Sequence, residues 1–282
     1  MQEIADLPFG TEVIEKIKNL SVVEAIGVHG SYVYGELDEY SDLDLVAVCS
    51  EIPSPEAREE FLGGLVDKIN RDFEVPERFL EDIDYIQVDE NYLGIDYVKA
   101  DYLEGLVDKL EDGESIPKDE IEDAIKFLYY SEVVWDPEEI LVSLKERMPE
   151  ADPSAARYFL YDLEKINLDG SWPKASLSAS ISRKNYLQIS KIFNRAIESY
   201  ILALCVINGE YYGGPKNAAF TMDKLDHKPE DCWKRLQRIS KIGNSKEEVK
   251  EKVEIFQDLR RELFEIIEEQ EELDLSDDLP DQ

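Results

Sequence analysis

Two apolar runs separated by a short polar stretch constrain the fold of this chain more than any other feature. The runs cover residues 22–28 and 43–48, and each has the length of one buried strand. Gly30 follows the first run closely, and Asp42 and Asp44 stand at the start of the second. The pattern predicts a strand, a Gly-Ser turn with a short helical segment, and a second strand that begins with two carboxylates.

The spacing of these two acids indicates a cation site. Asp42 and Asp44 are two residues apart, so on a strand both side chains project from the same face. Two carboxylates held side by side repel each other, and a divalent cation with oxygen ligands relieves that repulsion. We therefore expect this pair to bind metal.

The stretch over residues 30–46 reads GSYVYGELDEYSDLDLV. It contains Gly-Ser, then the intervening residues 32–41, then Asp-x-Asp, with Ser41 directly before the first acid. This arrangement resembles the signature of the nucleotidyltransferase superfamily, whose members include DNA polymerase β-like enzymes and antibiotic nucleotidyltransferases. The resemblance implies a polymerase β-like mixed sheet with helices, and an enzyme that transfers a nucleoside monophosphate.

The resemblance also implies a role for each residue of the motif. Asp42 and Asp44 would hold two Mg²⁺ ions that neutralise a triphosphate and activate an attacking hydroxyl. Gly30 has no Cβ, so its backbone can approach the triphosphate, and the Ser31 hydroxyl can donate to a phosphate oxygen. Ser41 is expected to join Gly30 and Ser31 in nucleotide binding.

Members of the family usually have a third carboxylate on a neighbouring strand, and two residues qualify here. Asp96 lies between apolar residues on a predicted strand, where burial of an acid is costly unless a metal or donor satisfies it. Asp84 is the rival, and an Asp96 that merely faces solvent on an edge strand is a further alternative. As the third acid, Asp96 would bind metal and accept the proton of the attacking hydroxyl.

Hydrophobic periodicity divides the chain into three parts. Residues 1–150 mix strands and helices, residues 151–270 contain helices without a convincing strand, and residues 271–282 form an acidic tail. The predicted fold class is therefore α+β, with a catalytic domain followed by an all-helical bundle domain. Strands are expected at residues 22–29, 44–49, 83–88 and 95–99, and helices at 11–20, 55–70, 101–110, 119–130, 137–147, 154–166, 182–207, 230–242 and 246–271.

One lysine of the helical half is a candidate phosphate contact. Residues 208–217 read NGEYYGGPKN and follow the long predicted helix. They resemble a loop that carries a phosphate-directed Lys in antibiotic nucleotidyltransferases, which assigns nucleotide binding to Lys216. An ordinary surface lysine at a helix start is the alternative.

The net charge and the spacing of the cysteines restrict which binding partners and which cellular compartment are expected. The 65 acidic and 31 basic residues give a net charge of -34, which disfavours nucleic acid and anionic membranes, because phosphate binding requires clustered Lys and Arg. Adaptation to high cytoplasmic salt explains such acidity. Cys49, Cys205 and Cys232 are scattered, as is typical of reduced thiols. With neither a basic-then-apolar leader nor an apolar run of about 18 residues, the chain is expected to be cytoplasmic, without a membrane span.

These observations combine into one expected activity. The chain would transfer AMP from ATP, with two Mg²⁺ ions, to a hydroxyl of a small molecule or a protein side chain, and release pyrophosphate. The alternative is an antitoxin or regulatory protein, related to the minimal nucleotidyltransferases, that acts on a helical protein partner.

Overall fold

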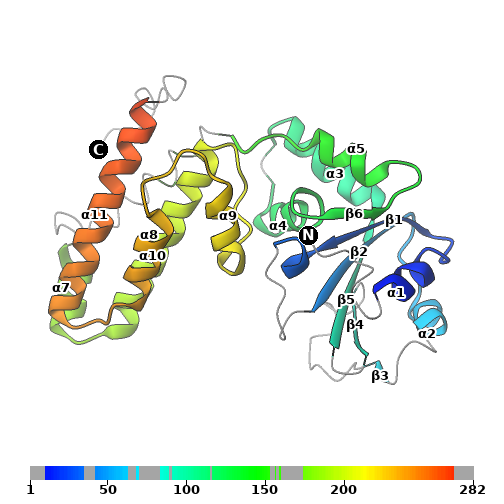
Figure 1. The fold of residues 1–282 in the computed structure, drawn as a ribbon, viewed down its shortest axis with the longest axis horizontal. Coiled ribbons are helices and arrows are strands. Elements are labelled where there is room, and N and C mark those ends of the chain that lie inside the picture. Colours follow the sequence, from blue (N-terminus) through cyan, green and yellow to red (C-terminus); the bar gives the residue numbers. More distant parts are fainter. Residues whose placement is uncertain are drawn as a thin grey trace. The chain divides into compact units, whose positions relative to one another are not determined.

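The structure is a computed structural model of the chain, and it divides into two compact units, Met1–Pro149 and Glu150–Gln282 (Figure 1). The residues that it describes are 10–34, 42–62, 68–69, 83–88, 91–114, 116–152, 156, 159 and 174–269.

The first unit is built on a mixed sheet with the strand order β3-β4-β5-β2-β1-β6. Its strands are β1 (Val23–His29), β2 (Leu43–Cys49), β3 (Lys68–Ile69), β4 (Ile83–Val88), β5 (Asn91–Lys99) and β6 (Glu132–Trp135). The β2–β5 pair is parallel, and the other neighbouring strands are antiparallel. β1 and β2, formed by the two apolar runs, therefore lie side by side within the sheet.

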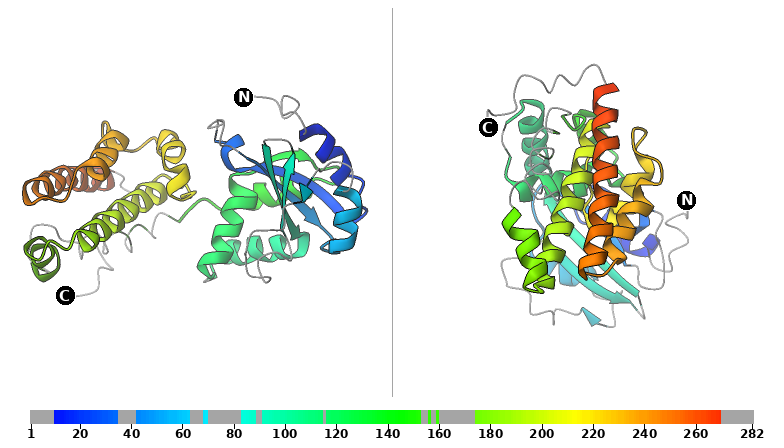
Figure 2. Two further views of the ribbon diagram at one scale, coloured as in Figure 1. Left: turned by 90° about the horizontal axis from the view of Figure 1, so that it is seen from below. Right: turned by 90° about the vertical axis from the view of Figure 1, so that its left-hand side faces the viewer.

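Helices cover both faces of this sheet. They are α1 (Gly10–Ile17), α2 (Pro55–Leu62), α3 (Ala100–Glu111), α4 (Lys118–Ala124) and α5 (Ile140–Arg147), with a 3-10 turn η2 (Gly30–Tyr32) and a π-helical turn η4 (Ile125–Tyr129). In Figure 2 the blue helices α1 and α2 lie on one side of the strands, and the green helices lie on the other.

Alternating side chains of β2 supply a core on each face of the sheet, as the period of two in a strand requires. Leu43, Leu45 and Ala47 are buried in the cluster that includes α1 and α2. Val46 and Val48 are buried in the other cluster, with residues of α3, η4 and α5. Burial of both faces anchors the strand whose first residues are the acids.

The second unit is helical within its described residues. Its elements are α7 (Lys174–Ser182), α8 (Tyr186–Ile207), a 3-10 turn η6 (Pro215–Asn217), α9 (Ala218–Lys224), α10 (Cys232–Lys241) and α11 (Lys246–Glu269). The long helices α8 and α11 run side by side (Figure 2). The buried hydroxyl of Tyr200 on α8 donates to the carbonyl oxygen of Leu259 on α11 at 3.0 Å. A single apolar cluster joins these helices.

The predicted fold class is confirmed, and the differences concern element bounds. The predicted helix over residues 55–70 is confirmed for α2 and wrong at Lys68 and Ile69, which form β3 and pair with β4. The predicted helix over residues 182–207 begins only at Tyr186, after a turn in which Lys184 has a φ of 54°. β5 starts four residues earlier than expected, at Asn91 rather than at Ile95. Most of the predicted helix over residues 154–166, and the tail over residues 271–282, lie outside the described residues.

Two observations concern the expected compartment. Of the helices that the structure describes, none combines the length and the apolarity that crossing a membrane requires. Cys49, Cys205 and Cys232 are buried free thiols, and burial raises the pKa of each to about 12. At neutral pH these three thiols are therefore uncharged and poorly nucleophilic.

Replacement of one residue in the sheet should loosen the first unit selectively. Leu45 is fully buried in β2, so Leu45→Ala removes packing and leaves a cavity, at a cost of about 2–5 kcal/mol. Hydrogen exchange followed by mass spectrometry should show faster exchange in β1, β2 and β5. Leu263→Ala in α11 is the matched control, and it should instead accelerate exchange in α8 and α11. Equal acceleration of both units by either variant would contradict two separately stabilised cores.

Candidate functional site

The site begins at the turn between β1 and η2, where the chain requires glycine. Gly30 has a φ of +71°, which strains residues with a Cβ. A Cβ built on this residue would lie 2.3 Å from Oδ2 of Asp44, much closer than any real contact. Antiparallel pairing places His29 directly opposite Asp44, and this register produces the close approach. The Gly30 backbone therefore lies directly against the second acid of the motif.

The Asp44 carboxylate is also confined from the other neighbouring strand. Parallel pairing places Gly94 of β5 beside Asp44, and a Cβ on Gly94 would lie 3.0 Å from Oδ1. Burial raises the pKa of Asp44, and the charges of Asp42 and Asp96 raise it further, while His29 and Lys126 oppose the shift. Asp44 is thus a carboxylate whose negative charge is destabilised by its surroundings and would be stabilised by a cation.

Asp96 lies on the same face of the sheet as Asp44. It pairs with Val46, two residues beyond the Asp44–Gly94 pair in the parallel ladder. Its Oδ2 accepts a hydrogen bond of 2.8 Å from Nζ of Lys126, and Nε2 of His29 lies 3.1 Å from the same oxygen. Burial alone would raise the pKa of Asp96, but these two partners outweigh burial and lower it. Asp96 therefore remains ionised although its side chain is only 12% exposed.

Asp84, the rival for the third acid, lies on the opposite face. It is paired with Ile95, one residue from Asp96, and successive residues of a strand point to opposite faces. Its Oδ1 lies 3.4 Å from a guanidinium nitrogen of Arg58, a residue of α2 that is 4% exposed. The geometry favours Asp96 as the acid beside Asp44 and gives Asp84 a structural ion pair.

The remaining residues of the motif differ in what the structure shows of them. Ser31 is 5% exposed, and its hydroxyl donates to the carbonyl oxygen of Asp42 at 3.4 Å, which ties the turn to the start of β2. Asp42 is half-buried and directly precedes β2. Ser41 lies outside the described residues.

The three acids supply the hard oxygen ligands that Mg²⁺ prefers, but they do not form a closed cluster. Where the structure describes the chain, no group of three or more His, Cys, Asp or Glu residues is arranged to hold a metal ion. Two features nevertheless fit a cation: the charges of Asp42 and Asp96 raise the pKa of the Asp44 carboxyl, and the Lys126 ammonium on Asp96 is itself a cation among these acids. Asp42 and Asp44 are the residues that would hold a metal first.

Three residues of this site were missed or undervalued in the sequence. Lys126 was not identified, because neither the motif nor the helical periodicity around it indicates an ion pair with Asp96. His29, at the end of β1, is only 3% exposed and contacts Asp96. Tyr85 lies close to Gly94, and burial together with the nearby acids raises its pKa. Only the strand order, which the sequence does not specify, brings these residues together.

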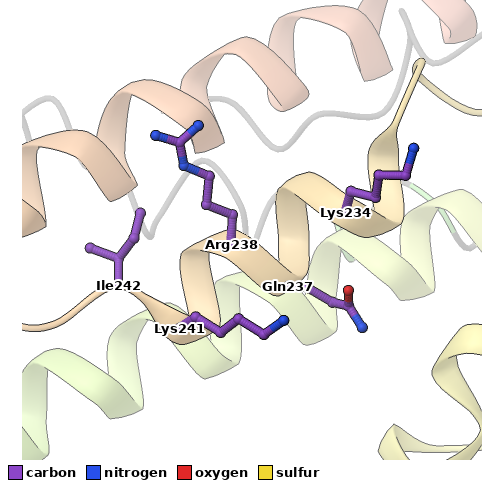
Figure 3. Close-up of a pocket in the computed structure, with 5 residues that line it drawn as sticks. All are labelled: Lys234, Gln237, Arg238, Lys241 and Ile242. Atoms are coloured by element: carbon purple, nitrogen blue, oxygen red, sulfur yellow. The ribbon is translucent and has the colours of Figure 1, made fainter.

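Lys216, the predicted phosphate contact, is an exposed residue of η6 in the second unit. The same unit contains a hollow of about 510 Å³ whose lining includes Tyr212, Trp233 and Glu198, a volume suited to a small molecule. A second hollow of about 370 Å³ lies along α10 (Figure 3), where Arg238 points towards α11. The lining of this second hollow consists of Lys234, Gln237, Arg238, Lys241 and Ile242.

Comparison with known protein families gives a match within the first unit. Residues 11–129 match the family model of the nucleotidyltransferase domain. The predicted family is confirmed for this stretch. It contains every acid of the site and Lys126, and it supports nucleotidyl transfer as the general activity.

The other comparisons add little. A crystal structure of a nucleotidyltransferase-like protein from Exiguobacterium sibiricum 255-15 aligns with 93% of this chain and 79% of its own, at 11% identity and a TM-score of 0.38. At that TM-score we draw no conclusion about this chain from the similarity. No curated protein matches the chain.

The close approach of the Gly30 backbone to the Asp44 carboxylate can be tested by a substitution with alanine, which adds one methyl group. Gly30→Ala must displace the Asp44 carboxylate and strain the backbone by about 1–2 kcal/mol, so we expect a lower melting temperature and weaker Mn²⁺ binding, measured by electron paramagnetic resonance. Gly105→Ala in α3 is the matched control, since its Cβ would meet nothing within 4 Å. It should stabilise the helix by about 0.5–1 kcal/mol and leave Mn²⁺ binding unchanged. Wild-type Mn²⁺ affinity in Gly30→Ala would contradict the proposed geometry.

A structural role for Asp84 predicts a different pattern. Asp84→Ala removes the carboxylate that lies beside the buried guanidinium of Arg58, so urea unfolding should show a loss of about 3–5 kcal/mol. Mn²⁺ binding by the folded variant should stay at the wild-type level. A variant of unchanged stability that lost Mn²⁺ binding would instead make Asp84 the third acid.

Proposed function

We propose that the chain transfers a nucleoside monophosphate, AMP in particular, from a nucleoside triphosphate to the hydroxyl of a small molecule or a protein side chain. The observation that carries this proposal is the Asp44 carboxylate confined between Gly30 and Gly94, within a matched nucleotidyltransferase domain. In the reaction, the acceptor oxygen bonds to the α-phosphorus, the bond from the α-phosphorus to the bridging oxygen breaks, and pyrophosphate leaves.

Each residue of the site has a distinct role in this proposed reaction. Asp42 and Asp44 hold Mg²⁺, which when bound neutralises the triphosphate and activates the attacking hydroxyl. Gly30 and Ser31, together with Ser41, bind the nucleotide at the turn, where the absence of a Cβ allows close approach to phosphate. Asp96 is the proposed base: it is ionised, and its Oδ1 has no hydrogen bond among those that the structure shows for the described residues, so it can accept the acceptor proton.

Two further assignments belong to this proposal. Lys216, on its exposed turn, is proposed to bind nucleotide phosphate. The net charge of -34 disfavours a nucleic acid as acceptor, because it repels phosphate backbones, and favours cationic small molecules, which it attracts. The alternative, a regulatory protein acting on a helical partner, requires no turnover, and the same experiment distinguishes the two.

The experiment measures pyrophosphate release from ATP, GTP, CTP and UTP with Mg²⁺, at low and at molar salt, against a panel of hydroxylated acceptors. We expect turnover that is fastest with ATP and that Asp44→Asn lowers by more than about a hundredfold. Asp112→Asn, at an exposed helix end, is the matched control and should leave the rate unchanged. Lys216→Ala should raise the KM for the triphosphate with little change in kcat. The enzyme assignment fails if wild type neither releases pyrophosphate nor binds Mg²⁺-ATP.

A further inference from the structure

The ammonium group of Lys126 is hydrogen-bonded to Asp96, the candidate third acid of the site. Lys126 belongs to η4, and its Nζ lies 2.8 Å from Oδ2 of Asp96. The same ammonium lies 4.7 Å from the centre of the Phe127 ring, within the range of a cation–π contact. Two independent contacts thus hold the charge of Lys126 at the acids.

The backbone around Lys126 is fixed by unusual hydrogen bonds. The N–H of Tyr130 donates to the carbonyl oxygen of Ile125 at 3.0 Å, five residues back, which closes the π-helical turn. Lys145 of α5 donates to the carbonyl oxygens of Leu128 and Ser131 just beyond. The turn that carries Lys126 is therefore anchored, while the Lys126 side chain itself is 43% exposed to solvent.

The charges explain why an ammonium is stable there. Asp42, Asp44 and Asp96 bring three carboxylates to one region, and the positive charge of Lys126 favours the ionised forms of both Asp44 and Asp96. A divalent cation bound between the same acids would satisfy the same charges more strongly. It would also repel an ammonium at a hydrogen-bond distance from one of its ligands.

We propose that Lys126 is a displaceable counter-ion, which holds Asp96 in the metal-free protein and releases it when a divalent cation binds at Asp42 and Asp44. The proposal rests on the proposed function of these acids and adds a step to it. Lys126 is a positioning residue: it keeps Asp96 ionised and in place, and its departure leaves Asp96 available to the metal or to the acceptor proton. Because the Lys126 side chain is exposed and unbranched, moving its ammonium away from Asp96 costs little free energy.

The test uses Mn²⁺ and Mg²⁺ as probes with the full-length chain. Lys126→Met removes the competing charge, so Mn²⁺ titration without nucleotide, followed by electron paramagnetic resonance, should show binding tightened about tenfold or more. Lys109→Met is the matched control, because Lys109 forms an ion pair of 2.7 Å with Glu120 in the same unit but away from the acids. Its Mn²⁺ affinity should equal that of wild type. Adding Asp44→Asn to Lys126→Met should abolish the gain.

Thermal unfolding separates this role from a purely structural one. Lys126→Met should melt at a lower temperature than wild type in chelator, and Mg²⁺ should raise its melting temperature more than that of wild type. A melting temperature that Mg²⁺ does not restore, or Mn²⁺ affinity equal to or below wild type, would overturn the proposal. Should Lys126→Met not fold, Lys126→Gln, which keeps a donor without the charge, replaces it in both measurements. Because these readouts need no turnover, absence of pyrophosphate release would count against the proposed function alone.

Discussion

The close approach of two glycine backbones to one carboxylate is the constraint on which the site depends. Gly30 directly follows β1, Gly94 belongs to β5, and these two strands lie on either side of β2, so Asp44 lies between the two glycines. A side chain at either glycine would need the space that the carboxylate occupies. The absence of a side chain at both glycines thus leaves the Asp44 carboxylate its place beside the two backbones.

The strand–turn–strand unit that carries this constraint was predictable from the sequence. Most residues of its strands are apolar because both faces of the sheet are covered, and its turn contains glycine because the backbone enters a region that other residues avoid. Both features depend on residues that are close together in the chain, so they can be predicted from a single sequence. The choice between Asp96 and Asp84 was not local: it required the register of β4 on β5, which decides the face each acid points to.

The features that the sequence did not predict involve long-range pairing or a change of helix type. Residues 68–69 continue an apparent helical pattern, yet they pair with β4, because a free strand edge favours backbone hydrogen bonds. The contact of Lys126 with Asp96 joins residues 30 positions apart and depends on a π-helical turn that hydrophobic periodicity does not reveal. Although this chain is rich in acids, the charged residue that adds most to the description of the site is a lysine, Lys126, which lies beside Asp96.

The π-helical turn makes chain length itself a determinant of this site. Such a turn contains one residue more than an α-helical turn, and each residue of a helix rotates the chain by about 100°. Loss of one residue between Ile125 and Tyr129 would turn Lys126 away from Asp96, or else pull α5 from its anchor at Lys145. Related domains that differ by a single insertion or deletion here would therefore differ in the charge beside the residue that corresponds to Asp96, although every residue of their shared motif is identical.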